Sequence, residues 1–339
     1  MSSTATPLRV QRPHAGTASE HIPVFDLAAY LGGKPDALNL LAIELREALE
    51  NVGFFCLVNH GVPQALIDDA FEQTRRFHLM SEDEKVAVAI NQDHVGYMGN
   101  EGELVRSSKY AVADIKPDVG EAFFVKQDQP TDGVALDNQW PENLTRFREP
   151  VVEYYDHMQA LARQLLPVYA TALDMAADYF DGAFNRADNL SILRMAHFPP
   201  NSLSDNQFNV GPHTDGSFLT LLPMTKVPGL ELLCQSGNWF AAKPPPGSII
   251  VNSGDMLTRW TNGRFLSTPH RVRSVSGTDR YSIPFFFQPN PEQVIACLPS
   301  CTSASNPPSE PAITAQAYFE WFMQQNFAHA SVESRLRID

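Results

Sequence analysis

Before residue 180, apolar residues recur mainly at the spacing of an amphipathic helix. Between residues 38 and 51, leucines stand three or four positions apart and form one apolar stripe, which is the pattern of a helix with one buried face. The same spacing predicts helices over residues 65–79 and 144–179, the second ended by Asp181-Gly182, and a last helix over residues 316–327.

After residue 190, short apolar runs replace the helical pattern. Turn pairs such as Pro228-Gly229 and Asn262-Gly263 separate them, and many short strands at close spacing indicate a β-sandwich or barrel. The expected strands cover residues 191–198, 218–224, 230–233, 239–241, 248–252, 271–275 and 281–287, and an earlier buried strand covers residues 54–58.

These patterns divide the chain into four parts. Residues 1–20 are polar and rich in Ser, Thr and Pro, which is typical of a flexible tail. We expect a mixed, helix-rich region over residues 21–180, a β core over residues 181–300, and a linker with a final helix over residues 301–339.

The net charge of the chain argues against two classes of binding partner. Of its 339 residues, 43% are hydrophobic and 19% are charged, as in ordinary globular proteins. The formal net charge is −14, which argues against nucleic acid and against an anionic membrane surface, because both attract basic proteins. The sequence gives no indication of the oligomeric state.

Cysteine usage and terminal composition predict a cytoplasmic protein. The four cysteines, Cys56, Cys234, Cys297 and Cys301, have no CxxC spacing and are too few for a disulfide framework. The N-terminus lacks the apolar segment of a secretory signal, and no stretch approaches the length of a transmembrane helix. We expect reduced thiols.

A candidate metal site lies in the β-rich part. His213 and Asp215 stand two residues apart, and in a strand such residues point to the same face. His270 follows 270 − 215 = 55 residues later, a distance that suits another strand of the same core. Two histidines and a carboxylate form the facial triad of non-haem Fe(II) oxygenases, which leaves positions open for a co-substrate and O₂. Taken alone, an HxD sequence more often marks a solvated turn.

An arginine follows the second histidine at short range. Arg280 begins another β-type run, and period-2 alternation places Arg280, Ser282 and Phe286 on one face. An arginine fork with a neighbouring hydroxyl suits a carboxylate ligand. The alternative, an arginine at a strand end facing water, is weaker here because the pair follows the metal-type residues.

Together these motifs resemble the iron- and 2-oxoglutarate-dependent oxygenase superfamily, in the branch of isopenicillin N synthase and the plant flavonoid and gibberellin oxygenases. The resemblance runs from about residue 22 to residue 327. Its segments are Ile22–Leu27, Asn51–Val62, His213-Thr214-Asp215, Asn252–Asp255, Asn262-Gly263-Arg264, His270-Arg271-Val272 and Arg280-Tyr281-Ser282.

The resemblance implies an α+β fold with a double-stranded β-helix (jelly-roll) core and flanking helices. It implies Fe(II) on His213, Asp215 and His270, with Arg280 and Ser282 binding the distal carboxylate of 2-oxoglutarate. The activity implied is oxidation of a small organic metabolite, by default its hydroxylation, with O₂ consumed and succinate and CO₂ released, as in secondary metabolism. The candidates for contact with substrate are Phe286, Tyr97, Met98, Phe123, Phe124 and Phe218.

The chain departs from the plant pattern at one place. Plant members carry Asn-Tyr-Tyr-Pro before the metal-binding strand, and this chain has Ala196-His197-Phe198-Pro199. The amide and the last tyrosine hydroxyl, which can support the co-substrate, are therefore absent.

Three alternatives remain open from the sequence. An oxidase like isopenicillin N synthase would use the same scaffold without 2-oxoglutarate. A zinc hydrolase would need a general base beside the metal, and no HExxH motif supports one. A catalytically inactive barrel could serve as a binding module, although all three candidate metal ligands are present.

Overall fold

Two β-sheets face one another in the computed structural model, which describes residues 21–100, 116–128, 138–200, 203, 206–273 and 277–327. Within these residues, the larger sheet has nine strands and the smaller has four. The larger sheet runs β1 (Val24–Asp26), β2 (Phe54–Val58), β10 (Ile249–Ser253), β7 (Leu219–Pro223), β13 (Phe285–Phe287), β5 (Ile192–Phe198), β4 (Glu121–Val125) and β3 (Gly96–Met98), with β12 (Arg280–Ser282) also paired to β5. The smaller sheet runs β6 (Val210–His213), β11 (His270–Val272), β8 (Leu230–Leu233) and β9 (Trp239–Ala241).

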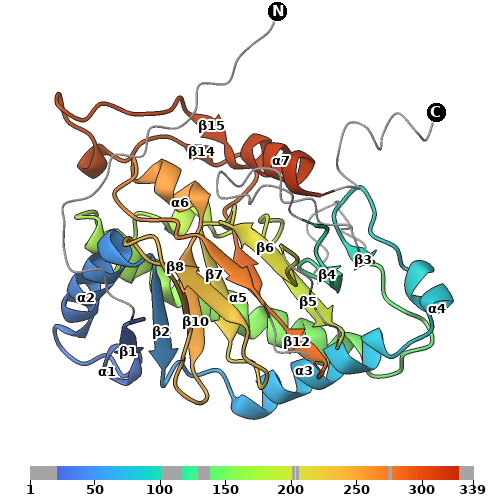
Figure 1. Cartoon of the computed structure of the whole chain (residues 1–339). Helices are drawn as coiled ribbons and strands as arrows, with labels where there is room; N and C mark the ends of the chain where they lie inside the picture. Colours follow the sequence, from blue (N-terminus) through green and yellow to red (C-terminus); the bar gives the residue numbers. More distant parts are fainter. Residues whose placement is uncertain are drawn as a thin grey trace, which may run out of the picture.

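Helices flank these sheets (Figure 1). Helix α5 packs against both α2 and α3, and α3 also contacts β5 and β12. The helices are α1 (Ala28–Leu31), α2 (Ala37–Asn51), α3 (Gln64–His78), α4 (Glu82–Val86), α5 (Arg148–Ala172), α6 (Asp255–Trp260) and α7 (Ala315–Asn326), with 3-10 turns at Asp181–Ala183 and Pro299–Cys301 and a small pair of strands β14 (Val294–Ile295) and β15 (Ile313–Thr314).

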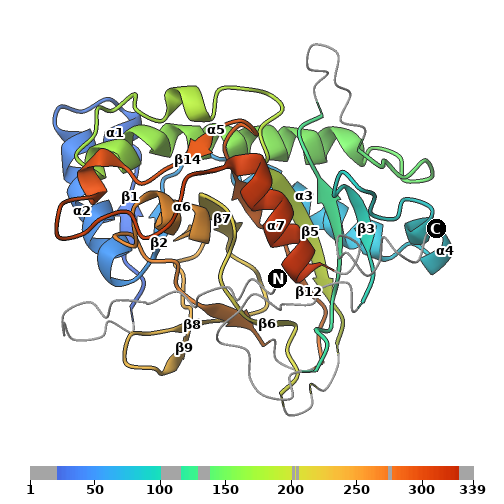
Figure 2. The same cartoon turned by 90° about the horizontal axis from the view of Figure 1, so that it is seen from above.

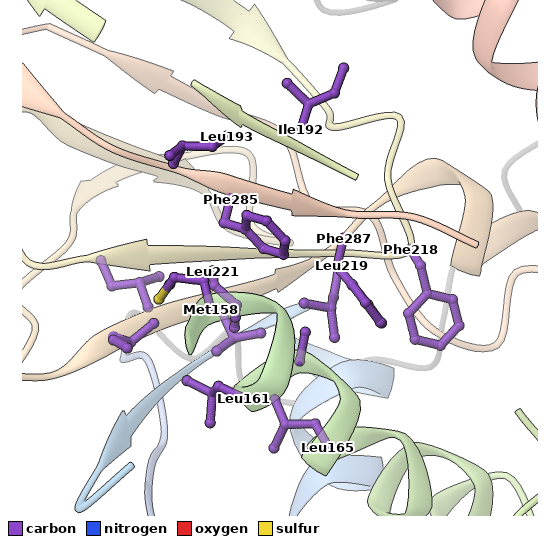
Figure 3. Packing of buried hydrophobic residues seen from close by; sticks show 14 of the residues in the cluster. Met158, Leu161, Leu165, Ile192, Leu193, Phe218, Leu219, Leu221, Phe285 and Phe287 are labelled. Atoms are coloured by element: carbon purple, nitrogen blue, oxygen red, sulfur yellow. The ribbon is translucent and has the colours of Figure 1, made fainter. Parts of the chain in front are cut away.

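The main core lies between α5 and the larger sheet. Figure 2 shows α5 on one side of that sheet and strands β6, β8 and β9 on the other. Met158, Leu161 and Leu165 of α5 point at Leu219 and Leu221 of β7 and at Phe285 and Phe287 of β13 (Figure 3). All of these side chains are buried, and complete burial of one such side chain contributes about 1.5–3 kcal/mol.

Strand alternation turns the remaining residues of β7 away from this core. Thr220 and Leu222 alternate with the helix-facing Leu219 and Leu221, and both line a cavity between the two sheets. Residues two apart share a face of a strand. The same sheet therefore presents an apolar face to α5 and a mixed face to the cavity.

The α+β architecture and the jelly-roll core expected from the resemblance are confirmed, with corrections to single elements. The helix expected over residues 144–179 is shorter, because Asp174 adopts a left-handed conformation (φ 58°) just after Leu173. The amides of Asp174 and Met175 then bond to the carbonyls of Thr171 and Ala170, which is the Schellman end of a helix.

Two predictions about strands were also wrong. The run over residues 281–287 is two strands, β12 and β13, broken at Ile283-Pro284. Asp215 does not share a strand with His213, because β6 ends at His213. The expected flexible tail, residues 1–20, lies outside the described residues. In the described part of the chain, no helix is both long and apolar enough to cross a membrane.

Candidate metal centre and co-substrate cavity

The cavity between the sheets brings the predicted metal residues together. His213 ends β6 and pairs directly with His270, which begins β11. Asp215 lies in the turn after β6, and its Oδ1 is 3.6 Å from the Nε2 atom of each histidine. One ion with bonds of ~2.1 Å can span such separations.

Hydrogen bonds on the far side of each imidazole fix its tautomer. The Nδ1–H of His213 donates to the carbonyl of Gly211 (2.8 Å), and that of His270 donates to the carbonyl of Thr268 (3.1 Å). Each Nε2 atom is thereby directed at Asp215. Metal-binding histidines are typically held in this way by a backbone acceptor.

The Asp215 carboxylate is held by its other oxygen. Oδ2 accepts hydrogen bonds from Thr220 Oγ1 (2.6 Å) and Asn252 Nδ2 (2.7 Å), so Oδ1 is directed to the histidines. Burial alone would raise the pKa of Asp215, but the adjacent His270 and His213 outweigh it and hold this pKa well below its usual range. The carboxylate is therefore ionised, as metal binding requires.

Arg280 supplies a buried positive charge to the same cavity. Its side chain is 2% exposed, its Nε donates to the carbonyl of Val227 (3.2 Å), and its guanidinium lies 5.2 Å from the ring centre of Phe198. Burial, with a smaller effect of Arg194, lowers the pKa of Arg280 to about 10, so it remains charged at neutral pH. Nη1 has no hydrogen-bond partner in the described structure. A buried unpaired charge is costly, and an anionic ligand would remove that cost.

The predicted co-substrate face is present despite the strand break. Ser282 and Phe286 line the cavity with Arg280. Ala196 and Phe198 line it too, at the positions where plant members carry the amide and the last tyrosine. Neither side chain can donate a hydrogen bond there.

Of the six residues predicted to contact substrate, the cavity lining includes only Phe286 among the described residues. Tyr97 and Phe123 pair across β3 and β4 and point to the helix side of the sheet, where the ring of Phe123 packs against that of Phe77 of α3. Phe218 packs in the aromatic core against Tyr169, Phe180, Phe184 and Trp260.

Met98 and Phe124 lie on the cavity side of the larger sheet without lining the cavity, because strand pairing aligns them with Ala196 and Arg194, which do line it. Phe124 is paired with Arg194 across β4 and β5, and paired residues of an antiparallel sheet point to the same side. The ring of Phe124 lies 5.9 Å from the guanidinium of Arg194, which does line the cavity.

The sequence reasoning missed three polar residues of the cavity, namely Arg194, Thr220 and Asn252. Arg194 had a sequence signal, because it is the one charged residue before His197 in the apolar run of β5. Asn252 stands in one of the segments that carry the resemblance, but no role was predicted for it. Thr220 had no signal, because its role depends on the pairing of β7 with β10, which puts it opposite Asn252.

Comparisons with known proteins agree with this geometry. A family model described as the 2OG-Fe(II) oxygenase superfamily matches residues 189–289, and one described as the N-terminal region of non-haem dioxygenases in morphine synthesis matches residues 22–143. A 2-oxoglutarate-Fe(II) type oxidoreductase of Emericella nidulans is 33% identical over 325 residues, covering 91% of each chain. The chain belongs to the 2-oxoglutarate- and Fe(II)-dependent oxygenase family.

Other members extend the comparison. Kihadalactone A synthase of Citrus sinensis is 33% identical to this oxygenase over 90% of its chain and 93% of the relative. A 2OG-Fe(II) oxygenase family protein of Caulobacter crescentus has a similar structure, with a TM-score of 0.77, 29% identity, and coverage of 90% and 99% of the two chains. A full-length protein of Neurospora crassa in complex with alpha-KG matches with a TM-score of 0.77, 25% identity, and coverage of 89% and 96%.

The oxygenase is thus an enzyme that uses Fe(II), 2-oxoglutarate and O₂ and acts on a small molecule. The oxidase that works without 2-oxoglutarate is not favoured, because the relatives are named for 2-oxoglutarate.

Proposed function

We propose that His213, Asp215 and His270 hold the Fe(II) and that Arg280, with Ser282, binds the distal carboxylate of 2-oxoglutarate. The observation that carries this proposal is the buried Arg280, whose unpartnered Nη1 lies in the same cavity as three convergent metal-type ligand atoms. The two nitrogens and one carboxylate oxygen suit Fe(II), and the guanidinium suits a carboxylate.

With iron and 2-oxoglutarate bound, the iron would let O₂ act as the oxidant, with two electrons from the oxidative decarboxylation of 2-oxoglutarate and two from a C–H bond of the substrate. The chain's own residues hold and orient the reactants. Thr220 and Asn252 keep one oxygen of Asp215 occupied, while Arg280 fixes the co-substrate at its far end. Apolar residues that line the cavity, among them Phe54, Leu222 and Leu230, exclude water from the space around the bound reactants.

We further propose that the substrate is a small organic metabolite that packs on Phe286 and is hydroxylated. Phe286 is half-buried and lines the cavity beside Ser282. Structures of similar proteins support a small substrate, because one is described as a complex with 2OG, Fe and JA and another as a dioxygenase for auxin oxidation in rice.

We also propose a cytoplasmic enzyme with no nucleic-acid or membrane partner. The net charge of −14 supports this, as do the four cysteines, all of which are free thiols in the structure.

Iron binding tests the metal assignment directly. His213→Ala, Asp215→Ala and His270→Ala should each reduce Fe(II) binding and abolish succinate formation, while circular dichroism shows a retained fold. His157→Ala, which alters a histidine of α5 bonded to its own helix at Glu153, is the control. An Asp215→Ala protein with normal iron affinity and turnover would contradict the assignment.

A further inference from the structure

A second buried charged cluster lies on the opposite face of the larger sheet from the cavity. Its centre is Glu121 of β4. Lys85 Nζ (2.7 Å) and the Tyr97 hydroxyl (2.6 Å) donate to one oxygen of Glu121. Two imidazoles face the other oxygen, with His197 Nδ1 at 2.8 Å and His78 Nδ1 at 3.3 Å.

His197 connects this cluster to the strand that carries the co-substrate residues. Its Nε2 lies 2.7 Å from Asp279 Oδ1, and its ring stacks on Tyr281 with 4.8 Å between ring centres. In the register of the sheet, His197 pairs with Tyr281, between the pairs that Arg280 and Ser282 make with β5. Arg280 and Ser282 point into the cavity from the other face.

Each ring nitrogen of His197 lies within hydrogen-bond distance of a carboxylate oxygen, so a proton or a metal ion must lie between the atoms of each pair, and distances decide which. Two tetrahedral ligands of one zinc ion stand roughly 3.3–3.6 Å apart at bond lengths of about 2.0–2.2 Å. His197 Nδ1 and Glu121 Oε1 are only 2.8 Å apart, whereas the corresponding separations at the candidate iron site are 3.6 Å. The short separation is that of a charge-assisted hydrogen bond. The Lys85 ammonium on the same carboxylate further disfavours a metal ion.

We infer that His197 carries the proton and, as an imidazolium, bridges Glu121 to Asp279, so that it holds β12 in the position where Arg280 and Ser282 bind 2-oxoglutarate. His197 is then a positioning residue, since it touches neither metal nor co-substrate. The inference rests on the proposed role of Arg280 and Ser282.

The surroundings favour the proton on His197 over His78. Burial alone would lower the pKa of His197, but hydrogen bonds to Glu121 and Asp279 outweigh it and hold this pKa above its usual value. Burial lowers the pKa of His78 despite Glu121, and the Nε2–H of His78 donates to the carbonyl of Met195 (3.0 Å). The titratable and charged groups around the bridge are His78, Arg75 and Glu72 of α3, Glu82 and Lys85 of α4, Tyr97 of β3, Glu121 of β4, Tyr281 of β12 and Asp279 just before it.

The sign of the pH effect follows from the raised pKa. The folded protein favours the imidazolium, so the bridge is present at acid pH and is lost as pH rises through the pKa of His197. The affinity for 2-oxoglutarate should fall over that range. Plant members carry a tyrosine at the position of His197. A tyrosine cannot carry a positive charge, so this dependence of 2-oxoglutarate affinity on pH requires the histidine.

The test measures 2-oxoglutarate binding to the Mn(II)-loaded protein by calorimetry, without O₂, from a pH of about 5.5 to about 9, a range that includes the usual histidine pKa of about 6.5 and higher values. Wild type should bind more weakly at the alkaline end. His197→Gln should bind about tenfold more weakly than wild type at acid pH, which corresponds to ~1.4 kcal/mol, and should lose most of the pH dependence. His157→Gln is the matched control and should follow wild type.

Further measurements separate positioning from a general effect on structure. His197→Gln should raise KM for 2-oxoglutarate with little change in kcat at saturation or in metal content. Asp279→Asn keeps a hydrogen-bond acceptor for His197 but removes the negative charge that raises the pKa of His197. The pH at which 2-oxoglutarate affinity begins to fall should therefore be lower in this variant. Nuclear magnetic resonance should show one histidine with a raised pKa in wild type, absent from His197→Gln.

Three results would overturn the inference: pH-independent binding in wild type, unchanged affinity in His197→Gln, or a second metal equivalent that is lost in His197→Gln but kept in His213→Ala. Failure of the proposed co-substrate site would look different. Arg280→Ala would then bind 2-oxoglutarate normally, while the histidine titration would still report whether the bridge exists.

Discussion

Asp215 can offer one free oxygen to a metal because two neighbours occupy the other. Removing either neighbour should let the carboxylate rotate and loosen the site. We expect Thr220→Val, which keeps the volume but deletes the hydroxyl, to weaken Fe(II) binding by roughly 10- to 100-fold, as is typical of residues that orient metal ligands. Thr258→Val is a suitable control, because Thr258 bonds to the carbonyl of Phe265 away from the cavity. Equal iron affinity in the two variants, measured by titration without O₂, would contradict this role.

Arg280 makes a different prediction, because it should affect the co-substrate and not the iron. Loss of one partner from a buried charged pair costs about 2–5 kcal/mol, so Arg280→Ala should raise KM for 2-oxoglutarate by roughly 30-fold or more. Arg280→Lys should recover only part of the loss, because an ammonium cannot form the two-pronged contact. Succinate release against 2-oxoglutarate concentration measures both variants. An unmoved curve for Arg280→Ala would remove the co-substrate assignment.

Single residues were predictable where their chemistry depends on order along the chain. His213, Asp215, His270 and Arg280 could be selected because a metal triad and a carboxylate fork need those residue types, and all four line one cavity. Aromatic residues were not predictable in this way. Tyr97 and Phe123 belong to strands that the sequence did not delimit, so which face they occupy could not be read from alternation.

At the level of elements, the helices α2, α3 and α7 lie within one residue of their expected bounds, because a long apolar stripe determines both the helix and its buried face. Short strands were less predictable. Strand β6 has only four residues, including Gly211 and Pro212, and such residues normally argue against a strand. Its place is determined by pairing with β11, which no local pattern contains.

One tight contact between elements should be sensitive to a single methyl group. Gly254, between β10 and α6, lies so close to Ser217 that an added Cβ would fall 2.0 Å from the Ser217 carbonyl oxygen. The next residue, Asp255, donates its amide to the carbonyl of Asp215 (2.7 Å). Gly254→Ala should therefore lower the free energy of unfolding by about 1–3 kcal/mol and weaken iron binding. Gly182→Ala, with no atom within 4 Å of its added Cβ, should change stability by less than ~0.5 kcal/mol. Urea unfolding of both variants checks this.

Across the whole molecule, the N-terminal segments and the jelly roll share one hydrophobic core and are joined by strand pairing and by a polar cluster. Strand β2 pairs with β10 and β4 pairs with β5 inside the larger sheet, and Glu121 joins α3, α4, β3 and β5 through its charged and polar partners. The sequence suggested a helical region followed by a β core. It could not indicate that β1, β2, β3 and β4 complete the sheet of the core, because those pairings link residues far apart in the chain.

The contacts of Glu121 with its four partners, which we call the Glu121 junction, should make the free energy of unfolding depend on pH in the acid range. Burial alone would raise the pKa of Glu121, but hydrogen bonds from His197, Lys85 and Tyr97 outweigh it and lower that pKa. The folded state thus favours the carboxylate. Its contribution to stability is fully present above the pKa of about 4.3 in the unfolded chain and is lost as pH falls through the lower folded value. Glu121→Gln should lower the free energy of unfolding at pH 7 by about 3–5 kcal/mol, because it removes the buried charged partner of Lys85 and leaves only the exposed carboxylate of Glu82. The difference in the free energy of unfolding between variant and wild type should shrink below a pH of about 4.

Urea unfolding at a series of pH values measures this difference, with Glu44→Gln on the exposed face of α2 as the control. A difference that stayed constant down to the lowest pH would show that the ionised carboxylate of Glu121 does not stabilise the junction.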